Sequence, residues 1–134
     1  MATIFTKIVN GEIPAYKVAE NDDYLAFLDI SPLRAGHTLV IPKVEVDYIF
    51  DLEDSVYTGL HLFAKQVAKA LESVVECTRI GVAVIGLEVP HAHIHLCPMD
   101  SLADLDFTKP RAVLSKEEFA RLSSKIAAAY ETQQ

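Results

Sequence analysis

The spacing of apolar residues predicts two long helices. Between Leu52 and Val75, apolar side chains recur every three or four residues and would form one stripe, which is typical of a helix packed against a core. The stripe consists of Val56, Leu60, Phe63, Val67, Leu71 and Val74. A second helix is expected to begin at Ser115, which can form a capping box with Glu118, and to extend to about Tyr130.

Five segments have the pattern of β-strands. They are Ala15–Glu20, Tyr24–Asp29, His37–Ile41, Arg79–Ile85 and the histidine-rich stretch Val89–Pro98. The fourth is almost continuously apolar, which favours a central, buried position in a sheet. A short helical segment is expected over Ile8–Pro14, where Gly11 and Pro14 would end it. The order of elements predicts an α+β fold: an antiparallel five-stranded sheet with one long central helix and a C-terminal helix.

Length and composition restrict the class of protein further. The chain has 134 residues, of which 51% are apolar, so we expect a single domain over residues 1–134. No apolar run approaches the ~20 residues that a membrane span needs, and the first residues lack a signal-peptide pattern. The net charge of −7 argues against binding to a nucleic-acid backbone. We therefore expect a soluble, cytoplasmic protein with reduced Cys77 and Cys97, and neither a nucleic acid nor a membrane as partner.

Three of the five histidines occupy alternate positions in the fifth predicted strand. Side chains alternate along a strand, so His91, His93 and His95 would share one face, together with Cys97, while the intervening apolar residues face the core. Three explanations are open. The face could simply be polar. Two imidazoles could bind zinc, with His37 or Glu88 as a further ligand. A neutral imidazole could also attack phosphorus, while neighbouring rings disfavour its protonation and donate hydrogen bonds to phosphoryl oxygens.

Several blocks of the sequence resemble the histidine triad (HIT) family. Residues 91–97, HAHIHLC, match its signature of three histidines alternating with apolar residues. Residues 11–14 (GEIP), 26–32 (AFLDISP) and 36–43 (GHTLVIPK) look like its N-terminal blocks, in the same order. The resemblance covers about residues 1–100 and leaves residues 101–134 as a C-terminal extension. It implies a HIT-like fold, a homodimer, and hydrolase or transferase chemistry at the α-phosphate of a nucleoside phosphate or phosphoramidate, with a purine as the expected base.

The resemblance also assigns roles to individual residues. His93 would be the nucleophile that forms a nucleotidyl-histidine intermediate, oriented by the backbone carbonyl of His91, and His95 would contact the phosphate. His37 would buttress His91. Asp29 would accept hydrogen bonds from the ribose hydroxyls, and Phe27 and Ile30 would form walls of the base pocket. Gly86 and Glu88, beside the phosphate, complete the nucleotide-binding candidates.

Besides a shortened loop between the last two strands, where residues 79–82 run almost directly to Gly86, the chain departs from the family pattern at two places that concern its ligands. Thr3, Thr6 and Glu45 stand where many bacterial members have cysteine and histidine ligands of a structural zinc, so we expect neither this zinc nor any other cofactor. Leu87 and Glu88 replace polar residues that usually contact the phosphate. This second departure keeps one alternative open beside a hydrolase, a dimeric nucleotide-binding or adaptor protein with weak catalysis. The pattern of alternate histidines keeps a third open, a zinc-dependent hydrolase that uses the histidine strand.

Overall fold

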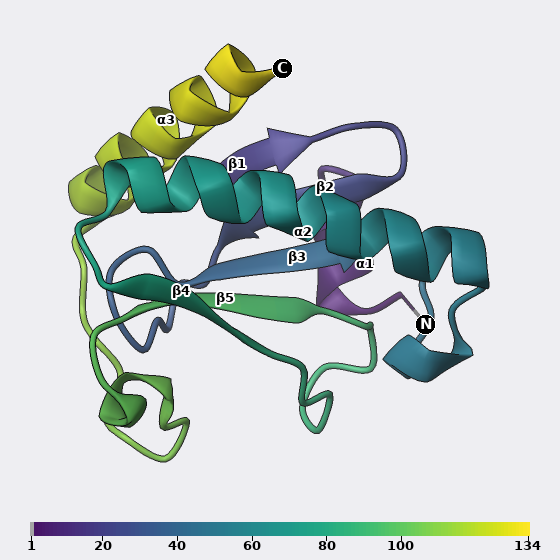
Figure 1. Ribbon diagram of the computed structural model, residues 1–134. Coiled ribbons are helices and arrows are strands. Elements are labelled where there is room, and N and C mark those ends of the chain that lie inside the picture. Colours follow the sequence, from purple (N-terminus) through teal and green to yellow (C-terminus); the bar gives the residue numbers. More distant parts are fainter. Residues whose placement is uncertain (1) are drawn as a thin grey trace.

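A computed structural model describes residues 2–134. Its centre is a five-stranded antiparallel sheet with the strand order β1-β2-β3-β5-β4, which confirms the predicted α+β fold (Figure 1). The strands are β1 Lys17–Glu20, β2 Tyr24–Leu28, β3 Thr38–Pro42, β4 Arg79–Ala83 and β5 Ile94–Met99. The helices are α1 Ile4–Val9, α2 Asp54–Val74 and α3 Lys116–Gln133, with short 3₁₀ turns at Ile49–Asp51 and Leu102–Leu105.

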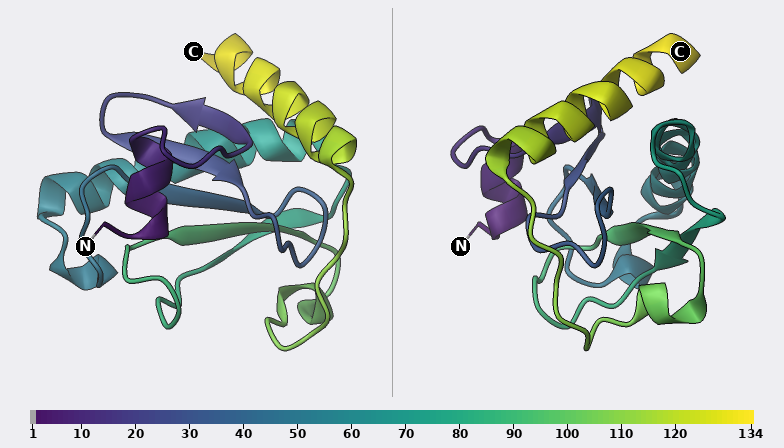
Figure 2. Two further views of the ribbon diagram at one scale, coloured as in Figure 1. Left: turned by 180° about the vertical axis from the view of Figure 1, so that it is seen from behind. Right: turned by 90° about the vertical axis from the view of Figure 1, so that its left-hand side faces the viewer.

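The sheet is covered on both faces. Helix α2 crosses one face, while α1 lies on the other and is best seen from behind in Figure 2. The face toward α2 carries Ala26, Val40, Ile94 and Leu96, and these pack with the buried stripe of α2. The opposite face carries Leu25, Phe27, Leu39 and Ile41, which pack with Phe5 and Ile8 of α1. This alternation follows from the two-residue period of a strand, and it leaves the histidine side of β5 on the α1 face.

Helix α1 begins earlier in the chain than the sequence pattern suggested. It spans Ile4–Val9 rather than Ile8–Pro14, because the hydroxyl of Thr3 accepts a hydrogen bond from the backbone N–H of Thr6 and so caps the helix. Phe5 and Ile8 then point toward the sheet, whereas Gly11 adopts a left-handed conformation just after the helix end.

Strand β4 is an edge strand, so the expectation of a central position was wrong. Its partner is β5, and Arg79 and Val82 are exposed. An almost continuously apolar segment therefore lies at the border of the sheet, with the side chain of Val82 58% exposed. No helix within residues 2–134 is long and apolar enough to cross a lipid bilayer.

Strand β5 begins at Ile94, so His91 and His93 precede the paired part of the strand. The backbone here forms hydrogen bonds outside the sheet: the N–H of His91 donates to the carbonyl of Val89, and the N–H of Ala92 donates to the carbonyl of Val46. The side chains still alternate as expected. All three imidazoles are at least nine-tenths buried, and Ala92 packs with the core under α2.

Candidate active site

His93 is held by a short hydrogen bond to the chain just before it. Its Nδ1 lies 2.7 Å from the carbonyl oxygen of His91, and a carbonyl can only accept. Nδ1 must therefore carry the proton, which leaves a lone pair on Nε2 of a neutral ring. Phe5 packs edge-on against the His93 ring, with the ring centroids 5.1 Å apart, and restricts its rotation. The geometry gives His93 a nucleophilic nitrogen in a defined direction.

The His91 ring is fixed at both nitrogens. Its Nε2 donates to the carbonyl of Pro42 at 2.8 Å, so Nδ1 accepts from the hydroxyl of Thr3 at 3.0 Å. Burial lowers the pKa of His91, in keeping with a neutral ring. The carbonyl of His91 orients His93. The His91 ring ties this part of the backbone to β3 on one side and to the start of α1 on the other.

Thr3, Thr6 and Glu45 form a hydrogen-bonded cluster beside His91. The carboxylate of Glu45 accepts from the N–H of Thr3 at 2.8 Å and from the hydroxyl of Thr6 at 2.6 Å, and these bonds lower the pKa of Glu45. Each hydroxyl proton is already directed at an acceptor. Two neutral hydroxyls and one carboxylate are poor zinc ligands compared with thiolates and imidazoles. This donor set does not fit a structural zinc.

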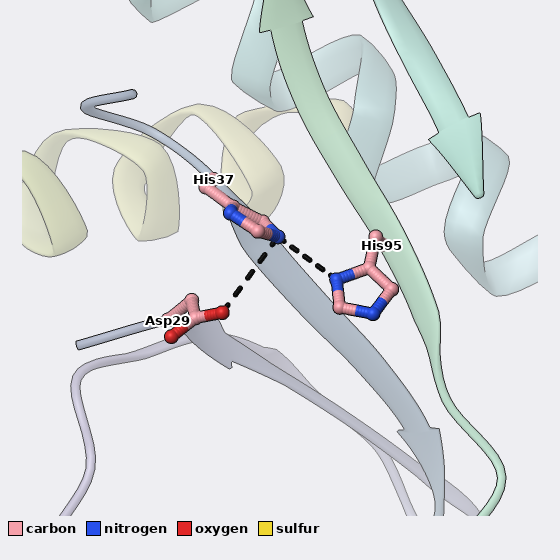
Figure 3. A group of neighbouring side chains, drawn as sticks. All are labelled: Asp29, His37 and His95. Carbon is pink, nitrogen blue, oxygen red and sulfur yellow. Dashed lines mark hydrogen bonds and ion pairs between the residues drawn. The ribbon is translucent and has the colours of Figure 1, made fainter. Parts of the chain in front are cut away.

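His37 and His95 are joined directly, as shown in Figure 3. The N–H of Leu33 donates to Nδ1 of His37 at 3.0 Å, so the proton of a neutral His37 is on Nε2, which donates to Nδ1 of His95 at 2.9 Å. The remaining proton of His95 is therefore on Nε2. The expectation that His37 buttresses His91 was wrong. Strand β3 pairs with β5 so that Leu39 lies opposite His95, which places His37 beside His95 instead.

Both rings of this pair are neutral at physiological pH. Burial, reinforced by the neighbouring imidazole of His95, lowers the pKa of His37 to about 3. Burial also lowers the pKa of His95 to about 4, with smaller contributions from His93 and Arg111. The mutual repulsion expected between adjacent imidazoles is present, but burial is the larger cause.

Asp29, His37 and His95 form the one cluster within residues 2–134 whose ligand atoms lie close enough together to suggest a metal site (Figure 3). Oδ2 of Asp29 is 3.7 Å from Nε2 of His37. That nitrogen carries the proton donated to His95, however, so it offers no lone pair to a cation. His93 is not part of the cluster. The arrangement is a hydrogen-bond relay rather than the zinc-binding histidine pair considered from the sequence.

A cavity of about 460 Å³ opens over the histidines on the α1 face. Five of the expected site residues line it: Asp29, Gly86, Glu88, His93 and His95. Gly86 has a positive φ of 76°, a conformation that glycine adopts without strain, and it turns the loop between β4 and β5 toward the cavity. Burial raises the pKa of Asp29, whose Oδ1 accepts from the N–H of Ser31 at 2.8 Å.

Two expected wall residues do not line this cavity. Phe27 is only 3% exposed and packs behind Phe5, with the ring centroids 5.5 Å apart, while Ile30 is 73% exposed outside it. The reason is the docking of α1 on this face of the sheet, which places Ile4 and Phe5 at the surface of the cavity beside Leu39. His37 and His91 also lie behind the lining residues and support those that reach it.

Phe107 and Arg111, which were not predicted from the sequence, line the same cavity. Phe107 packs edge-on against His95, with the ring centroids 4.8 Å apart. Both residues belong to the segment between β5 and α3, for which no role was predicted. A signal was present: this otherwise acidic stretch contains one aromatic residue and two cations, Lys109 and Arg111.

The fold and the site together define a class of α+β proteins in which a histidine-rich strand faces a cavity beside the N-terminal helix. The HIT domain model matches residues 10–102, and the chain belongs to the HIT family. It is 36% identical over 132 residues to an uncharacterized HIT-like protein of Borreliella burgdorferi, covering 92% of this chain and 95% of that protein. It is 35% identical over 130 residues to the adenosine 5′-monophosphoramidase of Schizosaccharomyces pombe, covering 95% and 97% of the two chains.

Solved structures show the same fold. A Hit-like protein of Bartonella henselae that is described as involved in cell-cycle regulation superposes with a TM-score of 0.81 at 30% identity, covering 95% of both chains. A Zn-bound histidine triad family protein of Mycobacterium smegmatis gives a TM-score of 0.84 at 26% identity, covering 99% of this chain and 96% of that one.

Proposed function

We propose that the protein is a nucleotide hydrolase or nucleotidyl transferase that cleaves a P–N or P–O bond at the α-phosphate of a small purine nucleotide. The observation that carries this proposal is the 2.7 Å hydrogen bond from His93 Nδ1 to the carbonyl of His91, which leaves the Nε2 lone pair for the cavity. The names of two yeast relatives, both adenosine 5′-monophosphoramidases, support a phosphoramidate as substrate.

The reaction would proceed in two displacements. Nε2 of His93 attacks the α-phosphorus, the bond to the leaving amine or alcohol breaks, and the leaving group takes a proton from the solvent. The ring then carries a positive charge, which the hydrogen bond to the His91 carbonyl stabilises. The Nε2–H of His95 donates to a non-bridging oxygen of the phosphoryl group. Water, or another acceptor in a transferase, then attacks the phosphorus and releases a proton to the solvent, and the P–N bond to His93 breaks to restore the neutral ring.

The rest of the cavity suits a nucleoside. The carboxylate of Asp29 would accept from the ribose hydroxyls, while Ile4, Phe5 and Leu39 offer an apolar wall to a base. Phe27 would act behind Phe5, as support for this wall. We further propose that the chain is cytoplasmic, binds no structural zinc and forms a homodimer. The exposed edge of β4 gives a second sheet room to pair with it.

A second candidate is a nucleotide-binding or adaptor protein with weak catalysis. Glu88 is exposed and lines the cavity, and Leu87 beside it offers no hydrogen-bonding side chain. A carboxylate near the phosphate would weaken the binding of an anion unless a cation offsets it.

Mass spectrometry after incubation with adenosine 5′-phosphoramidate and an acid quench distinguishes the two candidates. An enzyme of the proposed kind gives an adenylate adduct on the peptide that contains His93, and His93→Ala abolishes both this adduct and the turnover. Tight binding of AMP without any adduct would favour the adaptor. Turnover by His93→Ala at the rate of the unsubstituted protein would exclude the proposed mechanism.

A further inference from the structure

The segment between β5 and α3 is tied to the loop that joins β2 to β3, close to the cavity. In Figures 1 and 2 the two lie side by side at one end of the sheet. Nη1 of Arg111 donates to the carbonyl of Ser31 at 2.8 Å, and the N–H of Ala112 donates to the carbonyl of Pro32 at 2.8 Å. Two bonds between residues about 80 positions apart in sequence therefore fix the place of Arg111.

An aromatic side chain also supports the guanidinium. Its carbon lies 5.6 Å from the centroid of the Phe107 ring, and the same ring packs against His95 with the centroids 4.8 Å apart. Phe107 thus links Arg111 to the imidazole whose Nε2–H is free for a ligand. Both Phe107 and Arg111 are partly buried.

The carboxylates that line the cavity would repel a phosphate unless a cation offsets them. Asp29 and Glu88 contribute two carboxylates, and Arg111 is the one lysine or arginine among the described residues that line it. His37 and His95 are neutral, since burial lowers the pKa of His37 to about 3 and that of His95 to about 4. A phosphate entering this cavity therefore meets one permanent positive charge, the guanidinium of Arg111.

The guanidinium has donors to spare. It offers five N–H groups, of which one is used by the carbonyl of Ser31. Within residues 2–134 no carboxylate forms an ion pair with Arg111, in contrast to Arg34, which pairs with Asp100 at 3.1 Å. A cation held at a carbonyl and an aromatic ring, and not by a carboxylate, remains available to an anion.

We propose that Arg111 is a specificity-determining residue that binds a phosphate group of the substrate. It offsets the carboxylates of Asp29 and Glu88 and supplies hydrogen bonds that Leu87 and Glu88 cannot provide. The segment between β5 and α3 is then part of the substrate site and not only a connection to the last helix. This inference rests on the proposed function for the identity of the ligand as a nucleotide, but it concerns binding and not the chemical step.

Isothermal titration of AMP and of adenosine tests the proposal, with Arg111→Met, Arg111→Lys and Arg121→Met compared. Arg121 lies exposed on α3 outside the cavity, so its replacement makes the same change in net charge elsewhere. Because a charge-assisted hydrogen bond contributes more than a neutral one, Arg111→Met should weaken AMP binding by about ten- to a hundredfold. Adenosine binding should change little, Arg111→Lys should recover part of the affinity for AMP, and Arg121→Met should retain all of it.

The proposal would be overturned by equal losses for AMP and adenosine, by equal losses in Arg111→Met and Arg121→Met, or by an Arg111→Lys variant no better than Arg111→Met. Thermal unfolding of each variant separates a folding defect from a binding defect. If the unsubstituted protein binds AMP but forms no adduct with adenosine 5′-phosphoramidate, the catalytic proposal fails while the role of Arg111 stands. If Arg111→Met binds AMP as tightly as the unsubstituted protein, only the role of Arg111 fails. A protein that binds no AMP would contradict both.

Discussion

Nε2 of His37 and Nδ1 of His95 lie 2.9 Å apart, and the direction of this hydrogen bond is decided by a third residue. The N–H of Leu33 donates to Nδ1 of His37, so Nε2 of His37 carries the proton and is the donor in its hydrogen bond to His95. In consequence Nε2 of His95 is a hydrogen-bond donor, whereas Nε2 of His93 has a free lone pair. Two neighbouring imidazoles thus take opposite roles, because different backbone groups fix their tautomers.

Replacing Thr3 tests whether the start of α1 positions the nucleophile. Thr3→Val removes the hydroxyl that donates to His91, and we expect kcat to fall by about fivefold with KM little changed, as the loss of one hydrogen bond of about 1 kcal/mol implies. The substitution also removes the helix cap. Thr3→Ser keeps the hydroxyl and serves as the control, so steady-state kinetics of the two variants separate positioning from packing. A Thr3→Ser protein as slow as Thr3→Val would contradict this role.

Stability should fall as the pH drops below the ordinary range of histidine. The pKa of His37 is lowered to about 3 and that of His95 to about 4, from 6.5. The unfolded chain therefore binds protons below pH 6.5 that the folded protein rejects. Each of these histidines would remove about 1.4 kcal/mol per pH unit as the pH falls from 6.5 toward its folded-state value. Above pH 6.5 this loss is absent, because both histidines are neutral in the folded and in the unfolded chain.

Urea unfolding at pH values between 7.5 and 5 measures this slope. Burial raises the pKa of Asp29 and acts in the opposite direction, chiefly toward the acid end, so the interval just below pH 6.5 is the most informative. His37→Gln removes one titrating group and should flatten the curve. A stability that is constant from pH 7 to pH 5 is incompatible with two buried neutral imidazoles.

The protein should fold without bound zinc. The hydroxyls of Thr3 and Thr6 are occupied by His91 and Glu45 and do not replace thiolate ligands. After purification without a chelator, elemental analysis should find zinc well below one equivalent per chain, and EDTA should leave both the melting temperature and the turnover unchanged. Stoichiometric zinc whose removal lowers the melting temperature would show that the cluster binds metal after all.

Asp29→Asn tests the proposed contact with the ribose. The substitution keeps an oxygen that can accept from the N–H of Ser31, so the turn should be preserved. We expect AMP binding to weaken by about tenfold, because a bond to an ionised acceptor is replaced by a weaker one. Binding of 2′,3′-dideoxy-AMP should be almost unaffected. Equal losses for the two ligands would mean that Asp29 acts on the fold or on the phosphate.

Val82→Lys tests the proposed homodimer. Val82 is 58% exposed on the edge strand β4, and a lysine there opposes the pairing of a second sheet edge. Light scattering should give the mass of a dimer for the unsubstituted protein and that of a monomer for Val82→Lys. Ser124→Lys, exposed on α3, adds the same charge as a control and should remain dimeric. A monomeric unsubstituted protein would remove the basis of the proposal.

The sequence determined the elements that depend on local pattern. The apolar stripe of α2, the capping box at Ser115 and the alternation of histidines with Ala92, Ile94 and Leu96 all follow from helix and strand periodicity, and the structure has each of them. The triad and its surrounding blocks also sufficed to place the chain in its family. These features depend on residues close together in the chain.

Only the tertiary structure decided how distant residues meet. Pairing of β3 with β5 placed His37 on His95 rather than on His91, and the docking of α1 exchanged Phe27 for Phe5 at the cavity. The edge position of β4 could not follow from its composition, because an apolar segment can be covered by a sheet neighbour or lie at the border. Arg111 reached the cavity through its bond to Ser31 and the neighbouring bond of Ala112 to Pro32, contacts across 80 residues that no local pattern encodes.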